Sequence, residues 1–343
     1  MSNLDLSALE NWLAQKLPGQ TGLTAEPITG GQSNPTWFVT WGQRQLVLRK
    51  KPEGQILPGA HAVEREFRVL KALEATDVPV PTALWLEEDE SIIGTPFYVM
   101  DRLEGRVMSD CTLPDVSPQD RREMYLDMAR TMARMHAVRP NEVGLGDYGR
   151  PGNYFERQIR RWSKQYLESD GPRIPALDFL VDWLPENMPG DDGATSIAHG
   201  DFRLGNMMFH PTEPRVIAVL DWELSTLGHP LADLGFCVMP WHTAPDEYGG
   251  IDGTPWQESG IPTLEEFVAE YFSLALPTSP LRSFHMVFAL FRFAVIFVGI
   301  ADRARAGNAS SQEAAELAPL AERFARRAQE IIEKGDHLWG GTR

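Results

Sequence analysis

The chain has 343 residues, of which 43% are hydrophobic, and it contains ten Trp and sixteen Phe. This size and composition allow a large core divided between two lobes and argue against disorder. The formal net charge of −16 disfavours nucleic acid and anionic membrane surfaces as partners, because both attract clustered Lys and Arg. Two cysteines make no disulfide framework, and the first residues lack a signal-peptide pattern, so we expect a cytoplasmic protein.

The first hundred residues predict a small sheet that carries helices. Residues 4–17 form an amphipathic pattern that ends at Pro18-Gly19, and residues 60–75 show a second helical periodicity. Short runs of β-forming residues, separated by Gly and Pro, predict strands over residues 25–29, 37–41, 45–50, 83–87 and 96–100.

After Gly105 the sequence becomes mostly helical. Residues 118–138 hold a stripe of Met and Leu that indicates a packed core rather than an adaptable binding surface. An acidic loop is expected over residues 185–193, strands over 207–209 and 216–220, a long loop that serves a site over 241–262, and three or more helices over 263–337. The apolar stretch over 286–301 is interrupted by Arg292 and predicts a buried helix rather than a membrane span.

These patterns predict two units, an N-lobe over residues 1–103 and a C-lobe over residues 104–343. The expected class is α+β, with a small antiparallel sheet in the N-lobe and mainly helices in the C-lobe. No feature of the sequence indicates an oligomeric state.

Three polar residues around a predicted β-hairpin form the main candidate site. Asp201 and Asn206 precede the hairpin in an Asp-x4-Asn spacing, and Asp221 follows its second strand. Phosphoryl transfer needs such a set: one carboxylate orients the attacking hydroxyl, and two oxygen ligands hold Mg²⁺ against a triphosphate. The alternative is that all three are turn formers. His199-Gly200 ahead of Asp201 and Leu220-Asp221-Trp222 after an apolar strand favour catalysis.

Three segments together resemble the aminoglycoside phosphotransferase superfamily, which includes choline kinase and homoserine kinase relatives. These segments are His199-Gly-Asp-Phe-Arg-Leu-Gly-Asn206, Val219-Leu-Asp-Trp-Glu223 and Gly228-His-Pro-Leu-Ala-Asp-Leu234. Within the superfamily the chain is most similar to the branch that is fused to an acyl-CoA dehydrogenase in animals. The resemblance implies a bilobal protein-kinase-like fold, use of ATP and Mg²⁺, Asp201 as catalytic base and Asn206 and Asp221 as metal ligands. It also implies that Asp233 is a buried carboxylate that fixes the catalytic loop; a helix N-terminal charge is the alternative.

A glycine-containing segment, Thr29-Gly-Gly-Gln-Ser-Asn34, separates two predicted strands. Gly30 and Gly31 would let the backbone approach phosphates closely, and Ser33 and Asn34 can donate hydrogen bonds to them. The segment lacks the GxGxxG spacing of protein kinases, so a plain hairpin turn is the alternative. Its position one strand before a basic strand favours phosphate binding.

The strand Leu46-Val-Leu-Arg-Lys50 carries the candidate for gripping the triphosphate. Because side chains alternate along a strand, Val47 and Arg49 share one face and Lys50 lies on the other. Against the kinase pattern V-A-I-K, Arg49 takes the place of the lysine. Lys50 is interpreted as a solvated edge charge, although a shifted register would exchange the two roles.

A carboxylate on the following helix should pair with Arg49. Taking roughly 100° per residue, Glu66 lies within about 45° of the centre of the buried stripe, whereas Glu64 lies more than about 100° away. A carboxylate at the inner edge of a helix needs a partner. Glu66 is therefore the predicted partner of Arg49, with a surface pair as its alternative, and Glu64 is expected to be solvated.

The segment Phe97–Gly105 ends the last predicted strand of the N-lobe. The family resemblance makes this segment the hinge that reads adenine. It implies that backbone groups of Asp101 and Leu103 contact the base and that Met100 closes the rear of the pocket.

Zinc hydrolysis is a weaker alternative. His199, His210 and His229 flank the acidic residues, but their spacing matches no HExxH helix, and a structural hydrogen bond is the commoner role for His199. Gly-x-Ser-x-Gly does not occur in the sequence.

The expected reaction is transfer of the ATP γ-phosphoryl group to a hydroxyl of a small molecule. Aromatic residues of the C-lobe, expected near the acceptor, indicate a partly apolar compound: Tyr154, Trp162, Trp241, Tyr248 and Trp256. The fused relatives point to a hydroxylated acyl group or its CoA thioester. The rival acceptor is an aminoglycoside or amino alcohol, which would need carboxylates such as Asp246, Glu247 and Asp252. A nucleotide-binding module without catalysis and an interaction protein are the other classes considered.

Overall fold

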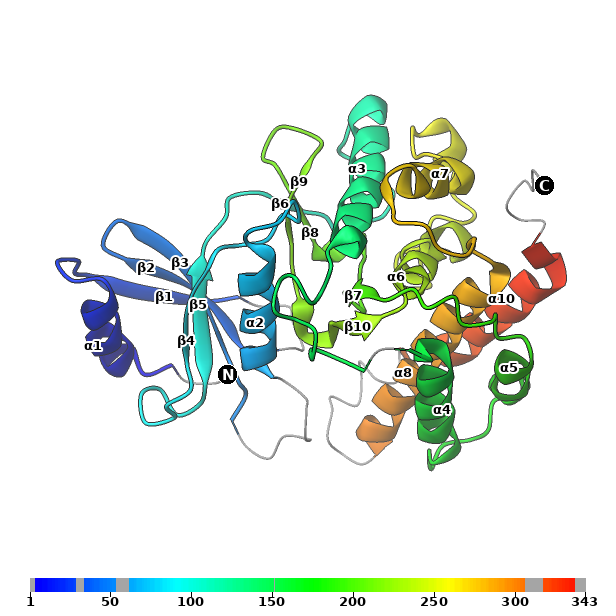
Figure 1. Cartoon of the computed structure of the whole chain (residues 1–343), viewed down its shortest axis with the longest axis horizontal. Coiled ribbons are helices and arrows are strands. Elements are labelled where there is room, and N and C mark those ends of the chain that lie inside the picture. Colours follow the sequence, from blue (N-terminus) through cyan, green and yellow to red (C-terminus); the bar gives the residue numbers. More distant parts are fainter. Residues whose placement is uncertain (1–3, 29–33, 54–61, 151, 306–316, 337–343) are drawn as a thin grey trace.

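The computed structural model describes residues 4–28, 34–53, 62–150, 152–305 and 317–336. These residues form two lobes, with an antiparallel sheet on one side and a mainly helical body on the other (Figure 1). The predicted α+β class and its bilobal arrangement are confirmed.

The N-lobe is built on a five-stranded antiparallel sheet with the strand order β1-β2-β3-β5-β4. Each strand predicted from the sequence is present, with its ends shifted by at most a residue or two. The strands are β1 Leu23–Pro27, β2 Thr36–Trp41, β3 Arg44–Lys50, β4 Ala83–Glu87 and β5 Phe97–Asp101. Helix α1 (Leu6–Lys16) lies on one side of this sheet and α2 (Val63–Leu73) on the other, toward the C-lobe (Figure 1).

The two faces of β3 bury different kinds of side chain. Leu46 and Leu48 pack with Trp12 of α1 in a small separate core. Val47 and Arg49 point to the opposite face, as the alternation along the strand predicts. Lys50 is not a solvated charge as expected: its side chain is fully buried, and its Nζ lies 2.8 Å from Glu53 Oε1. The Lys50 Nζ lies 5.9 Å from the ring centroid of Trp37, and burial of the apolar stem of a lysine beside such a ring is favourable.

The C-lobe begins with β6 (Arg106–Val107), which pairs with the β8–β9 hairpin. Its other elements follow in chain order: α3 Pro118–Ala137, α4 Tyr154–Leu167, α5 Pro175–Glu186, β7 Ser196–Ala198, β8 Met207–Phe209, β9 Val216–Val219, β10 Thr226–Gly228, α6 Pro230–Cys237, α7 Leu264–Leu274, α8 Ser283–Arg305 and α10 Leu320–Lys334. The expected loop over 185–193 begins late, because α5 includes Pro185 in its last turn. We propose that the lobes divide near residue 103, between β5 and β6.

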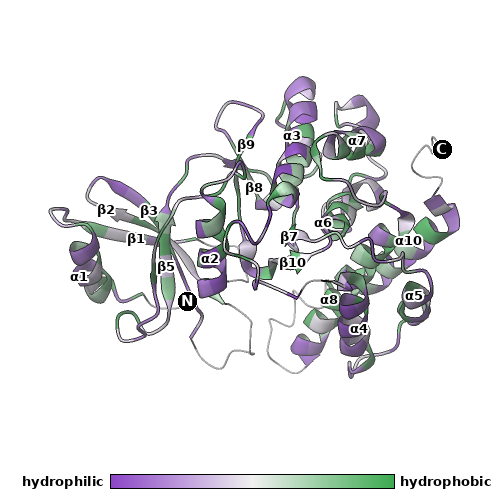
Figure 2. Cartoon of the chain, viewed as in Figure 1, coloured by the Kyte–Doolittle hydropathy of each residue, from purple (hydrophilic) through white to green (hydrophobic). Residues whose placement is uncertain are grey.

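Helix α8 forms the centre of the C-lobe. It packs against α4, α6 and α10 and is mainly apolar along its length (Figures 1 and 2). It is long and apolar enough to cross a membrane, but 72% of its most apolar window is buried inside the protein. Gly235 of α6 allows a close approach, since a Cβ there would lie 2.6 Å from the His285 carbonyl oxygen. The predicted buried helix is confirmed.

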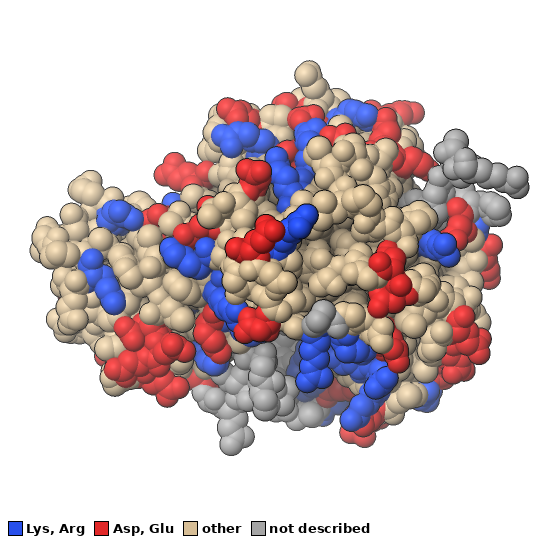
Figure 3. Space-filling view, in the orientation of Figure 1, with Lys and Arg blue, Asp and Glu red and all other residues tan. Residues whose placement is uncertain are grey.

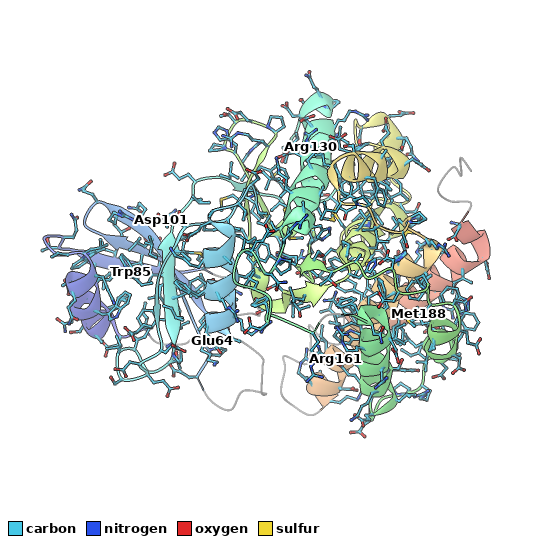
Figure 4. All side chains as sticks on the ribbon, viewed as in Figure 1. Glu64, Trp85, Asp101, Arg130, Arg161 and Met188 are labelled. Atoms are coloured by element: carbon cyan, nitrogen blue, oxygen red, sulfur yellow. The ribbon has the colours of Figure 1, made fainter. Side chains whose placement is uncertain are left out.

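Charged side chains of both signs are interspersed over the face shown in Figure 3. Arg130 of α3, labelled in Figure 4, lies 2.8 Å from Glu270 of α7 and so links two helices of the C-lobe. Such partly exposed pairs each contribute little stability. The packing of the apolar faces therefore determines the stability of the C-lobe.

Substituting the core should be far more destabilising than substituting the surface. Leu290 of α8 is fully buried, so Leu290→Ala should lower the free energy of unfolding by about 2–5 kcal/mol through lost burial and a cavity. Leu276 is 46% exposed, and Leu276→Ala should cost less than about 1 kcal/mol. Urea denaturation followed by circular dichroism measures both. Equal losses would contradict the placement of α8.

The fold should lose stability in mild acid partly through His285. Burial lowers the pKa of this imidazole to about 3, whereas an unfolded histidine titrates near 6.5. The unfolded chain therefore binds the extra proton first, and stability falls as pH drops from about 6.5 toward the folded pKa.

Replacing His285 isolates this contribution. Asn can accept the Arg282 N–H that His285 Nδ1 accepts at 2.9 Å. His285→Asn should reduce the dependence of unfolding free energy on pH by up to about 1.4 kcal/mol per pH unit between pH 4 and 6. Denaturant unfolding across this range is the measurement, with His210→Asn in the β8–β9 hairpin as the control. An unchanged slope would contradict a neutral buried His285.

Candidate active site

The loop between β7 and β8 brings Asp201 and Asn206 into direct contact. The Asn206 Nδ2 group donates to the Asp201 carbonyl oxygen at 2.8 Å and to Asp201 Oδ2 at 2.7 Å. Asp201 is partly exposed, whereas Asn206 is buried. Both bonds come from Nδ2, so these contacts do not use the amide oxygen Oδ1.

A buried carboxylate at the start of α6 holds the same loop. Asp233 is 1% exposed and accepts the backbone N–H groups of His199 at 2.6 Å and Gly200 at 2.9 Å. Burial alone would raise its pKa, but the nearby His136 and His199 and the Gly200 N–H lower it below its ordinary value. Asp233 is thus an anion that anchors the loop, and it also lies in the first turn of a helix.

Arg292 of α8 anchors the loop from the other side. Its Nη2 donates to the Gly200 carbonyl oxygen at 2.6 Å, one residue before Asp201. The guanidinium lies 5.8 Å from the ring centroid of Trp162 and 5.9 Å from that of Phe236. Sequence reasoning used Arg292 only as an interruption of an apolar run. An arginine in the middle of a buried apolar helix needs a polar partner, so its position in the sequence could have indicated a contact such as this one.

Backbone hydrogen bonds of the neighbouring Leu220 hold Asp221 close to Asp201 and Asn206. The Leu220 N–H donates to the Asn206 carbonyl oxygen at 2.8 Å, and His199 Nε2 lies 2.9 Å from the Leu220 carbonyl oxygen. His199 therefore makes a structural hydrogen bond. Asp221 itself has φ 64°, a left-handed conformation that a non-glycine residue adopts rarely and often at functional sites.

Arg49 connects the two lobes at this point. Its Nη2 lies 2.7 Å from Asp221 Oδ1, and its Nε lies 2.9 Å from Glu66 Oε2 of α2. The Nε–H is not aimed at that oxygen, so the Glu66 contact is an ion pair rather than a hydrogen bond. Asn34 and Tyr98 both donate to the Glu66 carboxylate. The strand and helix geometry expected from the sequence thus agrees with the observed contact, and the surface pair considered for Glu66 does not occur.

Burial determines the ionisation of Glu66. Desolvation raises its pKa to about 7, although the Arg49 guanidinium acts in the opposite direction. The pKa of Arg49 is itself raised by Glu66 and Asp221 despite its burial, so Arg49 remains a cation. Glu64, by contrast, is partly exposed at the lower end of α2 (Figure 4), with 40% of its side chain accessible, and lies 3.7 Å from Lys51.

A cleft with a cavity volume of about 340 Å³ lies between the sheet and the β8–β9 region. Its lining includes Asn34, Val47, Arg49, Met100 and Asp221. Apolar side chains surround these residues, as an adenine ring would require. Gly30, Gly31 and Ser33 lie outside the described residues.

The hinge prediction needs one refinement. The Asp101 N–H donates to the Thr82 carbonyl oxygen at 2.9 Å and is therefore occupied within the N-lobe. Asp101 lies at the end of β5 (Figure 4), with its side chain 2.7 Å from Arg44. The carbonyl oxygen of Asp101 and the N–H of Leu103 stay the predicted adenine contacts.

A second, smaller hollow, with a cavity volume of about 60 Å³, lies beside the loop over residues 199–206. Arg203, Leu204 and Gly205 of the loop form part of its wall, and Trp241 and Tyr248 line it as expected for the acceptor side. The other three aromatic residues predicted near the acceptor, Tyr154, Trp162 and Trp256, do not line it. Tyr154 and Trp162 instead belong to α4, which packs against α8.

The carboxylates expected to bind a cationic acceptor are already paired. Both Glu247 oxygens lie 3.0 Å from arginines of α10, Arg323 and Arg327. Asp246 lies 2.9 Å from Arg323, and Asp252 lies 3.4 Å from Arg327. The pairs fix the loop over residues 241–262 to α10 and neutralise its acidic side chains.

The donor atoms fit a magnesium ion shared with nucleotide phosphates. Mg²⁺ usually takes one or two protein oxygens and completes its shell with phosphate and water. The Asn206 amide oxygen and the Asp221 carboxylate supply such a pair. Within the described part of the chain, no group of three or more His, Cys, Asp or Glu residues is arranged to hold a metal ion.

Two lobes with a cleft between them, and Asp221 at the edge of that cleft, make up a kinase-like fold. The family model for the phosphotransferase enzyme family matches residues 24–272. The chain belongs to this family.

Similar proteins and structures agree with this membership. Acyl-CoA dehydrogenase family member 10 of Mus musculus is 43% identical over 308 residues, which is 89% of this chain and 29% of that protein. The chain spans less than half the length of the curated relatives it matches. A structure from Ralstonia eutropha, provisionally described as an aminoglycoside phosphotransferase, is 46% identical with a TM-score of 0.88 and covers 97% of this chain and 99% of its own.

A more distant structure shows the kinase-like fold alone. It is an aminoglycoside phosphotransferase in ternary complex with AMP-PNP and hygromycin B, 17% identical, with a TM-score of 0.60. The alignment covers 94% of this chain and 98% of that one. The predicted family and bilobal fold are confirmed.

Removing the Arg292 anchor should loosen the catalytic loop without unfolding the protein. In Arg292→Met the Gly200 carbonyl loses its donor, so amide hydrogen exchange over residues 199–206 should become faster. Phosphoryl transfer should fall by about tenfold to a hundredfold, because small displacements at a reacting group are costly. Arg303→Met, an exposed change on the same helix, is the control. Unchanged exchange in Arg292→Met would show that Asp233 alone holds the loop.

Proposed function

We propose that the chain is an ATP- and Mg²⁺-dependent kinase that phosphorylates a hydroxyl group of a small molecule. One observation carries the proposal: Asp201, Asn206 and Asp221 are joined in one loop system that faces the Arg49–Glu66 pair across the cleft. Phosphoryl transfer depends on positioning and on charge stabilisation, and this arrangement supplies groups for both.

In this proposal Asp201 is the catalytic base. Its carboxylate is held by Asn206 Nδ2 at 2.7 Å and remains partly exposed, so it can accept the proton of a hydroxyl aligned with the γ-phosphate. Asn206 and Asp221 are the proposed metal ligands. A bound Mg²⁺ would neutralise charge on the β- and γ-phosphates.

Arg49 would grip the triphosphate. It now contacts Asp221 and Glu66, and phosphate oxygens can take the place of the Asp221 carboxylate while Glu66 keeps the guanidinium oriented. Asn34 lines the same cleft. Gly30, Gly31 and Ser33 stay candidate phosphate contacts by sequence, since they lie outside the described residues. Backbone groups of Asp101 and Leu103 would bind adenine beside Met100.

The proposed acceptor is a hydroxylated acyl compound, free or as its CoA thioester. Its support is the second hollow, which is mainly apolar and has the Arg203 side chain in its wall. The acyl-CoA dehydrogenase names of the related proteins point in the same direction.

An aminoglycoside or amino alcohol is the competing acceptor. The neighbouring complex with hygromycin B favours it. The pairing of Asp246, Glu247 and Asp252 with α10 arginines disfavours it, because a polycation would find these carboxylates already neutralised.

Asp201→Asn separates catalysis from nucleotide binding. Loss of the base should lower phosphate transfer by at least about a hundredfold, while stabilisation of the folded protein by Mg-ATP should persist. The assay follows γ-labelled ATP with a panel of hydroxy acids, hydroxyacyl-CoAs, amino sugars and amino alcohols. Asp110→Asn, at an exposed position, is the matched control.

Two results with the wild-type protein would contradict the kinase proposal. Binding of Mg-ATP without transfer to any alcohol, and without ATP hydrolysis, would support a nucleotide-binding module instead. An absence of thermal stabilisation by Mg-nucleotide would leave an interaction protein as the better description.

A further inference from the structure

Arg203 lies two residues after Asp201 but lines the second hollow rather than the nucleotide cleft. Its Nε is 3.3 Å from Asp201 Oδ2, and its guanidinium lies 5.6 Å from the ring centroid of Tyr248. The side chain is 38% exposed. It therefore presents a partly free cation beside the proposed base, on the acceptor side.

The loop is shaped to accommodate this side chain. A Cβ at position 205 would lie 2.7 Å from Arg203 Nη1, so Gly205 provides the space in which the guanidinium folds back over the loop. A larger residue there would push the cation away from the hollow.

The opposite wall is equally constrained. Tyr248 has φ 65°, an unfavourable conformation for a non-glycine residue. The preceding residue, Glu247, is 4% exposed and lies 3.0 Å from both Arg323 and Arg327 of α10. These ion pairs fix the segment that places the Tyr248 ring against Arg203.

The remaining wall is mainly apolar, with Ser109 and Thr243 as further polar side chains. Among the residues described around the hollow, Arg203 is the one cation, and the one carboxylate, Glu247, is neutralised by α10. The apolar wall consists mainly of Met128, Phe236, Met239, Trp241, Phe267 and Phe293. Such a hollow favours an alkyl chain whose polar end carries oxygen acceptors.

We infer that Arg203 is the specificity-determining residue for the acceptor, and that it binds a carboxylate or acyl carbonyl oxygen while the alkyl part fills the hollow. This inference rests on the proposed function and deepens it: the acceptor is a hydroxylated acid or its acyl derivative. The hydroxyl then lies at Asp201, a short distance along the same molecule.

Ligand binding tests the inference without requiring turnover. Isothermal titration calorimetry on the full chain with AMP-PNP and Mg²⁺ would compare four octyl compounds: octanoate, the octanoyl thioester of N-acetylcysteamine, 1-octanol and octylamine. Their equal tails hold apolar burial constant while the polar end changes. Octanoate should bind at least about tenfold more tightly than octylamine, as expected for a charge-assisted hydrogen bond.

Variants of Arg203 assign the effect to this side chain. Arg203→Met should lower octanoate affinity by about tenfold or more and leave 1-octanol nearly unchanged. Arg203→Lys should retain part of the preference, and Arg215→Met, an exposed change in the β8–β9 hairpin, should retain all of it. The octanoyl thioester shows whether Arg203 needs a free carboxylate. Its affinity should be close to that of octanoate if an acyl carbonyl oxygen is sufficient, and close to that of 1-octanol if a carboxylate is required.

Two results would overturn the inference. One is octylamine binding as tightly as octanoate, or octanoate affinity unchanged in Arg203→Met. The other is a kinetic pattern in which Arg203→Met lowers kcat equally for acidic and basic acceptors without changing KM, which would assign the arginine to the transferred phosphoryl group. If no alcohol accepts phosphate, the proposed function fails, while the binding measurements still decide the role of Arg203.

Discussion

The buried Asp233 carboxylate is the contact on which the site depends. Two consecutive backbone N–H groups, those of His199 and Gly200, are satisfied by this one anion, so the residue before Asp201 cannot shift without leaving buried charge unpaired. Arg292 holds the Gly200 carbonyl from α8. The loop over residues 199–206 is therefore held between α6 and α8, at the end of β7, which pairs with β10.

A series of hydrogen bonds and one ion pair connects this loop to the rest of the site. Asn206 holds Asp201, the Leu220 N–H holds the Asn206 carbonyl, and Asp221 reaches Arg49 in the other lobe. Arg49 is in turn oriented by Glu66, which is 1% exposed and pairs with a cation that keeps its charge. The Arg49–Asp221 ion pair thus lies where a metal ion and a triphosphate would bind. The metal would attract Asp221 and the phosphates would attract Arg49, so each partner could exchange its contact.

The sequence allowed the elements with clear periodicity to be predicted. Alternation along β3 placed Val47 and Arg49 on one face, and helical spacing placed Glu66 beside them. It failed for Lys50, because a strand pattern shows which face a side chain takes and not whether neighbours such as Trp37 cover it. Contacts between distant segments, such as Arg203 with Tyr248 and Arg292 with Gly200, depend on the assembled C-lobe, and no local pattern encodes them.

A crystal structure with Mg²⁺ and AMP-PNP tests the central claim most directly. We expect the metal within about 2.1 Å of the Asn206 amide oxygen and an Asp221 carboxylate oxygen. We also expect Arg49 moved from Asp221 onto the phosphates while still paired with Glu66, and Asp201 facing the γ-phosphate. A nucleotide bound outside the cleft, or a metal held by other residues, would contradict the assignment of this loop as a phosphotransferase centre.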